Sequence, residues 1–107
     1  MAQSFVDAKL RAGKVTVFEK ESCPFCVRAK TIIHKYKFKK DRLEIINIAN
    51  MENVSSIQDY LCQLSGERTV PRIFIEKECI GGCSDLVPLD SSGELEKRLI
   101  GIGALEQ

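Results

Sequence analysis

Short apolar runs recur along the chain between polar and glycine-containing stretches, and such runs are typical of buried strands. The runs are VTVF at 15–18, LEIINI at 43–48, RIFI at 72–75 and ECIG at 78–81. Residues 76 and 77 alone separate the last two runs, so we expect these two strands to form an antiparallel hairpin.

Between these runs, apolar residues recur every three to four positions, which is the spacing of one helical face. This pattern predicts four helices. Their apolar residues are Phe5, Val6 and Leu10, ended by Gly13; Phe25, Ala29, Ile32, Ile33 and Tyr36, directly after Pro24; Ile57, Tyr60, Leu61 and Leu64, closed by Gly66; and Leu95 with Leu99.

The order of the elements predicts a fold of the α/β class. The first two strands flank a helix and should be parallel, whereas the last two pair antiparallel, which makes a four-stranded mixed sheet flanked by helices. This is the layout of a thioredoxin-like fold. With 107 residues, 44% hydrophobic content and no repeat or linker, we expect a single domain over residues 1–107.

Charge and targeting signals narrow the range of partners. Sixteen basic and fifteen acidic residues leave a formal charge of +1, so no global field recruits nucleic acid or an anionic membrane. The segment HKYKFKKDR at 34–42 mixes basic and aromatic residues as a nucleic-acid patch does, but basic side chains also suit the C-terminus of a helix. The N-terminus lacks the apolar core of a secretory signal, and no apolar stretch is long enough to span a bilayer, so we expect a cytoplasmic protein.

The segment KESCPFCVR at 20–28 carries the candidate chemistry. Two cysteines at this spacing suit half of a zinc site, a disulfide framework or a redox couple. The total of five cysteines is odd, which makes a poor disulfide framework in a reducing compartment. Zinc and redox chemistry therefore remain.

The position of the proline favours the redox couple. Pro24 suits the first position of a helix, which places Cys23 at the N-cap, where unpaired backbone donors and a nearby cation such as Lys20 favour a thiolate. Cys26 lies one turn deeper and should stay protonated. We therefore expect Cys23 to attack and Cys26 to close an intramolecular disulfide.

The rival hypothesis is a metal-binding module that uses Cys23, Cys26, Cys79 and Cys83 as thiolate ligands. Structural zinc pairs usually lie on short turns, whereas Cys26 is expected inside a helix and Cys79 inside a strand. We therefore predict no metal site. The fifth cysteine, Cys62, lies off the apolar stripe of its helix and is expected to be exposed and inert.

Three motifs together resemble a known family. CPFC, TVPRIFI and GGCSDL occur in the order and spacing of glutaredoxins, also called thioltransferases, and the resemblance spans the whole chain. The MAQ, IQDYL, GELE and IGAL stretches are similar to the cytosolic dithiol branch of vertebrates. The resemblance implies a monomeric glutathione-dependent thiol–disulfide oxidoreductase that reduces glutathione–protein mixed disulfides and some protein disulfides. It implies glutathione as co-substrate and no tightly bound cofactor; Pro24 argues against the iron–sulfur cluster that some relatives hold.

The resemblance also implies a glutathione site. In the family, Val70 pairs with the glutathione backbone and Pro71 is cis, while the glycine carboxylate is received by cationic and amide side chains. The implied binding residues are Lys20, Phe25, Gln58, Arg68, Thr69, Val70, Pro71, Gly82, Cys83, Ser84 and Asp85.

At the last four positions, Gly82 permits close approach, the Cys83 and Ser84 amides would hold the γ-glutamyl carboxylate, and Asp85 its ammonium group. Each of these residues also has a purely structural interpretation: the charged side chains as solvated surface groups, and Ser84 or Asp85 as an ordinary N-cap.

The chain departs from the family pattern at two positions. Phe25 stands where relatives carry tyrosine, so one hydroxyl is absent near the sulfur, and we expect altered tuning without loss of activity. Glu76 stands in the hairpin where relatives carry glycine, so we expect a left-handed backbone and mild strain there.

Overall fold

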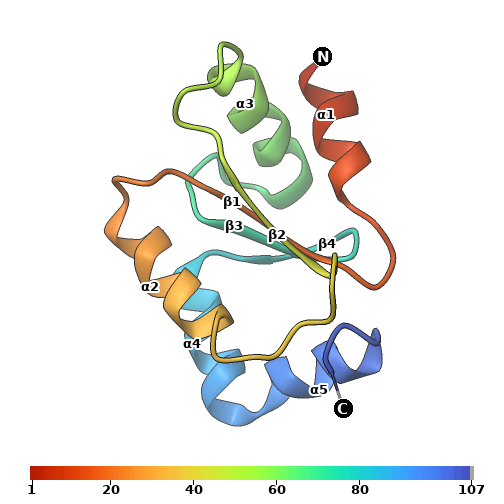
Figure 1. The fold of residues 1–107 in the computed structure, drawn as a ribbon. Helices are drawn as coiled ribbons and strands as arrows, with labels where there is room; N and C mark the ends of the chain where they lie inside the picture. Colours follow the sequence, from red (N-terminus) through yellow and green to blue (C-terminus); the bar gives the residue numbers. More distant parts are fainter. Residues whose placement is uncertain (107) are drawn as a thin grey trace.

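The computed structural model describes residues 1–106 and contains a four-stranded sheet with helices on both faces (Figure 1). The strands are β1 (Val15–Glu19), β2 (Leu43–Asn47), β3 (Arg72–Ile75) and β4 (Glu78–Gly81). The helices are α1 (Ala2–Lys9), α2 (Pro24–Ile33), α3 (Val54–Ser65), α4 (Cys83–Ser92) and α5 (Glu94–Gly101).

The sheet has the order β2-β1-β3-β4, and its pairings are those expected from the sequence. β1 and β2 are parallel, with Val17 opposite Ile45, because α2 provides the crossover between them. β3 is antiparallel to both β1 and β4. The mixed four-stranded sheet of the thioredoxin-like fold is thus confirmed.

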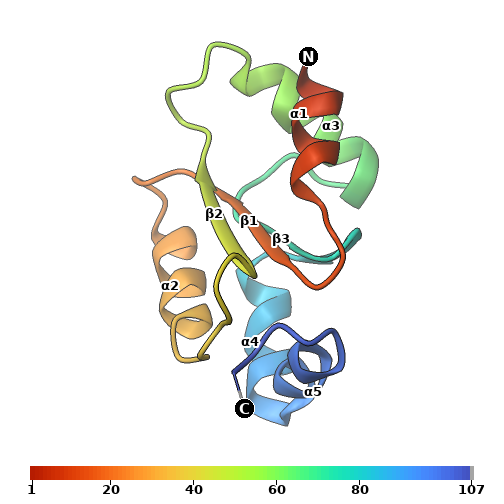
Figure 2. The same ribbon diagram turned by 45° about the vertical axis from the view of Figure 1, so that its right-hand side comes forward.

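Each face of the sheet has its own apolar cluster because side chains alternate along a strand. Val15 and Val17 of β1 pack toward α2, α4 and α5, whereas Phe18 packs toward α1 and α3. Phe18 meets Phe74 of β3 edge to face, with ring centroids 5.9 Å apart. Figure 2 shows α2, α4 and α5 on one side of the sheet and α1 with α3 on the other.

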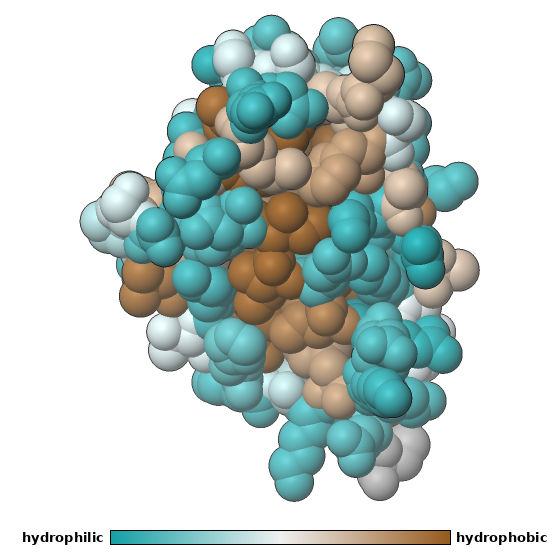
Figure 3. All heavy atoms as spheres, turned by 45° about the horizontal axis from the view of Figure 1, so that its top comes forward, coloured by the Kyte–Doolittle hydropathy of each residue, from teal (hydrophilic) through white to brown (hydrophobic). Residues whose placement is uncertain are grey.

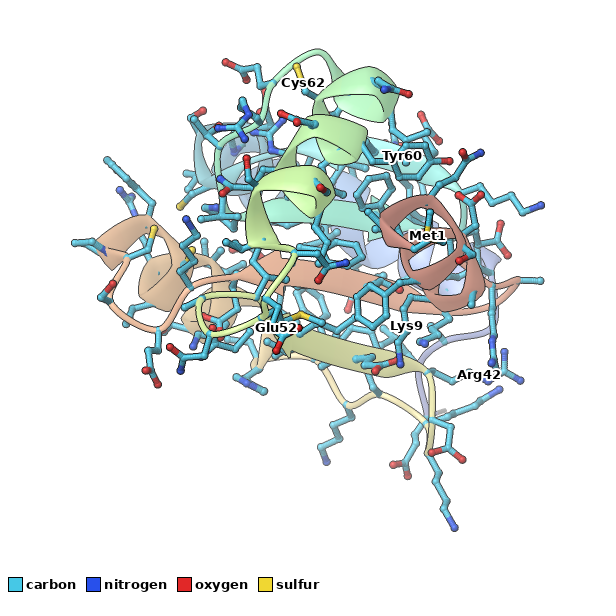
Figure 4. The ribbon with its side chains drawn as sticks, turned by 90° about the horizontal axis from the view of Figure 1, so that it is seen from above. Met1, Lys9, Arg42, Glu52, Tyr60 and Cys62 are labelled. Atoms are coloured by element: carbon cyan, nitrogen blue, oxygen red, sulfur yellow. The ribbon has the colours of Figure 1, made fainter. Side chains whose placement is uncertain are left out.

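The outer surface is mixed in character. Hydrophilic side chains cover most of the face seen in Figure 3, with apolar atoms exposed in a band between them. Among residues 1–106, no helix is both long and apolar enough to cross a membrane. Figure 4 shows α1 beside α3, where the Tyr60 hydroxyl donates to an Asp7 carboxylate oxygen at 2.6 Å.

The expected helix boundaries were wrong at both ends of the chain. The opening helix ends at Lys9 with Leu10 as its C-cap, whereas Gly13 forms a later turn with φ of 72°. The C-terminal region forms two helices where one was expected around Leu95 and Leu99, because Gly93 adopts a left-handed conformation between them. Pro88 is the sixth residue of α4, where it removes one backbone donor from the helix.

Three residues of the expected stripes, and Cys62 beside one of them, also differ from the expected position or burial. Tyr36 lies beyond the end of α2, and Phe25 is 63% exposed instead of packing in the core. Leu64 is 42% exposed, and Cys62 is partly buried where full exposure was expected. These errors share a cause, since helical spacing defines a face of the helix without saying how far the neighbouring elements extend over it.

The hairpin and the end of α3 agree with the sequence. Gly66 ends α3 in the left-handed conformation, with φ of 88°. Glu76 adopts φ of 57°, as expected, and its carboxylate accepts a hydrogen bond from the Gly13 amide at 2.7 Å. A charge-assisted hydrogen bond therefore offsets part of the cost of a left-handed glutamate.

Candidate active site

Cys23 lies at the N-cap of α2, directly in front of Pro24 at the first helical position. Its backbone is extended, with φ of −90° and ψ of 116°, and its sulfur accepts a hydrogen bond from the Cys26 amide at 3.3 Å. The Cys23 Sγ also lies 3.7 Å from the Val70 carbonyl oxygen, to which the thiol form donates. The sulfur therefore occupies the position of a capping oxygen, where a negative charge is stabilised by the helix N-terminus.

Cys26 has the opposite environment. Its side chain is fully buried, and burial raises the pKa of its thiol to about 12, helped by the hydrogen bond to Cys23 and by the negative charges of Cys23 and Glu19. A backbone contact with Lys20 acts in the other direction. The structure thus holds one thiol at a helix terminus and the other in apolar surroundings that keep it protonated.

A groove of about 340 Å³ lies beside these cysteines. It brings together eight of the residues expected to bind glutathione, from the start of α2, the loop before β3 and the start of α4. They are Phe25, Thr69, Val70, Pro71, Gly82, Cys83, Ser84 and Asp85. The Val70–Pro71 peptide bond is cis, as the family resemblance implied. A larger hollow of about 610 Å³ lies between the β3–β4 hairpin and α5, and neither cysteine of the pair lines it.

The start of α4 presents backbone donors to this groove. Gly82 is the N-cap, and its amide donates to the Asp85 carboxylate at 2.9 Å, so neither Ser84 nor Asp85 is the N-cap itself. The Asp85 and Leu86 amides both donate to the Gly82 carbonyl at 3.1 Å. The Cys83 and Ser84 amides precede these first hydrogen bonds of the helix, which is the arrangement that binds a carboxylate.

Gly82 also permits a close approach between segments. A Cβ atom there would lie 2.8 Å from the Arg72 Nη2 and 3.3 Å from the Pro71 carbonyl oxygen. The Arg72 side chain and the Pro71 carbonyl would have to shift to admit a larger residue. The close approach expected at this glycine is therefore used by the protein itself to bring β3 and α4 together.

The other three expected residues form a separate group connected by hydrogen bonds. The Lys20 ammonium donates to the Gln58 side-chain oxygen at 3.2 Å, and the Gln58 amide donates to the Arg68 carbonyl at 2.9 Å. The Arg68 guanidinium points toward α3 and donates to the Asp59 carboxylate at 3.0 Å and to Ser55. These residues do not line the groove itself, so the expected set divides into two parts.

Two groove residues were missed in the sequence. Arg72 is 4% exposed, donates from Nε to the Pro71 carbonyl at 3.1 Å and lies 3.6 Å from the Glu67 carboxylate. Both residues line the groove. The available signal was an arginine inside the otherwise apolar RIFI strand, since a buried guanidinium needs partners that only a polar pocket provides.

The rival metal module is not assembled. Among residues 1–106, no group of three or more histidine, cysteine, aspartate or glutamate side chains is arranged to hold a metal ion. Cys26 lies in α2 and Cys79 in β4, as expected. All five cysteines are free thiols in this structure.

The geometry defines a class of protein: a thioredoxin-like fold with a buried and a capping thiol beside a groove. Comparison with known proteins narrows this class. The family model described as Glutaredoxin matches residues 15–80. The chain is 55% identical over 106 residues to Glutaredoxin-1 of Homo sapiens, covering 99% of this chain and 100% of that protein. It is 53% identical over 106 residues to Glutaredoxin-1 of Mus musculus, covering 99% of each.

Solved structures agree. The oxidized glutaredoxin 2 from Chlamydomonas reinhardtii has a TM-score of 0.87 at 33% identity, covering 97% of this chain and 95% of that chain. A buckwheat glutaredoxin–glutathione complex has a TM-score of 0.89 at 28% identity, covering 99% of this chain and 94% of that chain. The chain belongs to the glutaredoxin family. It is a glutathione-dependent thiol–disulfide oxidoreductase, and the close pair of Cys23 and Cys26 fits its active site.

Proposed function

We propose that Cys23 is the nucleophile and Cys26 the resolving thiol of this oxidoreductase. The Cys23 thiolate attacks the glutathionyl sulfur of a mixed disulfide, forms the Cys23–glutathione disulfide and releases the target as a thiolate, which takes up a proton. A second glutathione thiolate then attacks that disulfide, so that oxidised glutathione leaves and the Cys23 thiolate is regenerated. The observation that supports this division is the Cys23 sulfur at the α2 N-cap, with Cys26 buried one turn behind it.

The dithiol route uses the second cysteine. When Cys23 is joined to a target protein, Cys26 loses its proton and attacks the Cys23 sulfur, which forms the Cys23–Cys26 disulfide and releases the target as a thiol. Two glutathione molecules then reduce that disulfide. This route allows the protein to reduce protein disulfides as well as glutathione mixed disulfides.

The groove is proposed as the glutathione site. Val70 supplies backbone groups beside Cys23, the Cys83 and Ser84 amides receive the γ-glutamyl carboxylate, and Asp85 pairs with its ammonium group. Phe25, Thr69, Pro71 and Gly82 complete the wall. The glycine carboxylate lies toward Lys20, Gln58 and Arg68, which are already connected to one another. The buckwheat protein was solved as a glutathione complex, and its similar fold supports this proposal.

Several broader properties belong to the same proposal. Residues 1–107 form one domain that acts as a monomer in the cytoplasm, with glutathionylated and disulfide-containing proteins as partners in redox homeostasis and electron transport. Glutathione is a co-substrate, and the protein needs no tightly bound cofactor. Neither nucleic acid nor membrane is a partner.

Two assays with matched variants test the proposal. One follows glutathione-dependent reduction of a glutathionylated peptide, and the other follows reduction of a protein disulfide, for the native chain and for Cys23→Ser, Cys26→Ser and Cys62→Ser. The proposal requires Cys23 in both assays, Cys26 mainly in the second and Cys62 in neither. Activity that survives in Cys23→Ser would contradict it.

A further inference from the structure

Glu19 ends an otherwise apolar face of the sheet. Because side chains alternate along a strand, Val15, Val17 and Glu19 of β1 share one face, and the two valines pack in the apolar cluster beneath α2. Glu19 is only 4% exposed. A carboxylate at such a position is costly unless it is paired, so its retention beneath the active-site helix needs an explanation.

The partner of Glu19 comes from α2. The Lys30 ammonium lies 2.9 Å from the Glu19 Oε1, and Lys30 is four residues after Cys26, which places both on neighbouring turns of one helical face. The two partners of this ion pair differ in burial, because the Lys30 side chain is 26% exposed and that of Glu19 is 5% exposed. Within residues 1–106, Glu19 Oε1 is the one buried side-chain nitrogen or oxygen with no hydrogen-bond partner, although Lys30 pairs with it at 2.9 Å. The Glu19 charge is therefore balanced by this ion pair alone, and the cation of the pair is partly exposed to solvent.

This charge acts on the Cys26 thiol. Three further titratable groups border the region: Cys23 from the same helix turn, Lys30 from the next turn, and Cys83 of α4, which is buried in the cluster that contains Ala29. Of the charged groups, Cys23 and Glu19 both raise the pKa of Cys26. Once Cys23 has accepted the glutathionyl group it carries no charge, so the contribution of Cys23 disappears while that of Glu19 remains.

We propose that the Glu19 carboxylate holds Cys26 in its thiol form and thereby slows closure of the Cys23–Cys26 disulfide, so that the glutathionylated intermediate is left for a second glutathione. This inference rests on the roles proposed above for the two cysteines. In the step concerned, Cys26 loses its proton to solvent, a sulfur–sulfur bond forms between Cys26 and Cys23, and glutathione leaves as a thiolate that is protonated by solvent. No hydrogen bond connects Glu19 to Cys26, so its effect is that of a nearby charge.

The decisive experiment measures this closure directly. The reduced protein is mixed rapidly with excess oxidised glutathione and quenched with acid, and intact-protein mass spectrometry follows the mixed disulfide as it appears and decays to the intramolecular disulfide. Peptide mapping of the early sample locates the glutathionyl group. The variants are Glu19→Gln, Glu19→Leu as a second uncharged form that continues the valine face, and Glu21→Gln as a control that removes one exposed carboxylate from the turn before Cys23.

The expected result is faster closure in both Glu19 variants. Removal of the charge lowers the Cys26 pKa, which raises its thiolate fraction at neutral pH more than it lowers the nucleophilicity of the sulfur, so we expect an acceleration of about twofold to threefold. Followed from about pH 6 to pH 11, the native rate rises throughout because the Cys26 pKa of about 12 lies above this range, whereas the rates of the Glu19 variants begin to level off at its upper end. A merely structural change alters the rate at every pH and leaves the shape of the profile unchanged.

Four other outcomes contradict the inference. Equal closure rates in the native chain and the Glu19 variants would show that the Glu19 charge has no influence on closure. Slower closure in Glu19→Gln assigns the carboxylate the opposite role of proton acceptor, and equal acceleration in Glu21→Gln makes the effect one of net charge. A glutathionyl group found on a residue other than Cys23 refutes the proposed cysteine roles and, with them, the inference. This result distinguishes a failure of the proposed roles from a failure of the Glu19 inference alone.

Discussion

The N-termini of α2 and α4 meet the same groove, and they differ in what satisfies their first backbone donors. At α2 the donor of Cys26 is met by the Cys23 sulfur at 3.3 Å, so the acceptor is part of the protein. At α4 the Asp85 carboxylate accepts from Gly82, and the Cys83 and Ser84 amides stay ahead of the first helical hydrogen bonds. One helix terminus thus holds the sulfur that we propose as the nucleophile, and the other is suited to a carboxylate supplied by the substrate.

The sharpest contrast lies within the first turn of α2. Because burial raises the Cys26 pKa from an ordinary value of 9.0 to about 12, its thiolate fraction at neutral pH is about a thousandfold below that of an ordinary thiol. We expect iodoacetamide to label Cys23 rapidly and Cys26 barely, with Cys26 labelling increasing about tenfold per pH unit. Peptide-resolved mass spectrometry measures both rates, and preferential labelling of Cys26 at pH about 6 would reverse the assigned roles.

Replacing the capping sulfur should abolish the chemistry proposed at the N-terminus of α2. Serine is itself a good N-cap, so Cys23→Ser should keep the fold while both reductase activities fall at least about a hundredfold. Turnover with glutathionylated peptide and with protein disulfide measures the loss, and thermal unfolding checks the fold. Cys62→Ser is the matched control and should retain full activity.

Cys26→Ser should separate the two routes. Reduction of protein disulfides should fall about tenfold or more, because the mixed disulfide with the target loses its internal resolving thiol. Reduction of glutathione mixed disulfides should persist or accelerate, since the intermediate no longer diverts into the Cys23–Cys26 disulfide. Complete loss of the second activity in a folded variant would make Cys26 obligatory.

At α4, Asp85→Asn should weaken glutathione binding while preserving the cap. The amide oxygen still accepts from Gly82, but the charge that pairs with the γ-glutamyl ammonium is lost, so KM for glutathione should rise about three- to tenfold. Initial rates against glutathione concentration measure the effect. Asp41→Asn removes an equal charge outside the groove lining and should leave KM unchanged; the same KM in both variants would return Asp85 to a purely structural role.

The smallest effect is expected outside the groove lining. Lys20→Ala removes one partly exposed cation near the proposed glycine carboxylate, and the Gln58 and Arg68 groups remain, so KM for glutathione should rise about twofold to threefold. The effect should shrink as salt is added, because exposed charges are screened. Lys77→Ala in the hairpin turn provides the control, and an unchanged KM in Lys20→Ala would exclude a binding role for this cation.

The cysteine end of the site could be predicted from sequence because its physics is local. Pro24 after Cys23 dictates an N-cap and an exposed sulfur, and Cys26 three residues later must lie one turn inward. The sheet was also predictable, since four apolar runs joined by a helical crossover and a hairpin allow few arrangements of the strands. Local sequence likewise indicated the turn at Gly66, whereas the left-handed conformation at Glu76 was expected from the family resemblance.

The rest depends on contacts between distant segments. Arg72 and Glu67 line the groove only because β3 and α4 meet at Gly82, and no local pattern records that meeting. The exposure of Phe25 follows from the absence of a covering element at the start of α2. Pro88 lies inside α4 because tertiary packing outweighs the loss of one backbone donor.

The two helix N-termini are fixed relative to each other by a joint at their opposite ends. The Asp90 carboxylate of α4 accepts from the Lys35 ammonium at 2.7 Å and from the Tyr36 hydroxyl at 2.5 Å, just beyond the end of α2. These two hydrogen bonds lower the pKa of Asp90. The contribution of this joint to stability is therefore complete above the usual range of an aspartate and is lost only as pH falls through the lowered value. In the proposed binding mode, the distance that glutathione spans between the Cys23 sulfur and the start of α4 is accordingly set in advance, by an anchor that stays ionised at neutral pH.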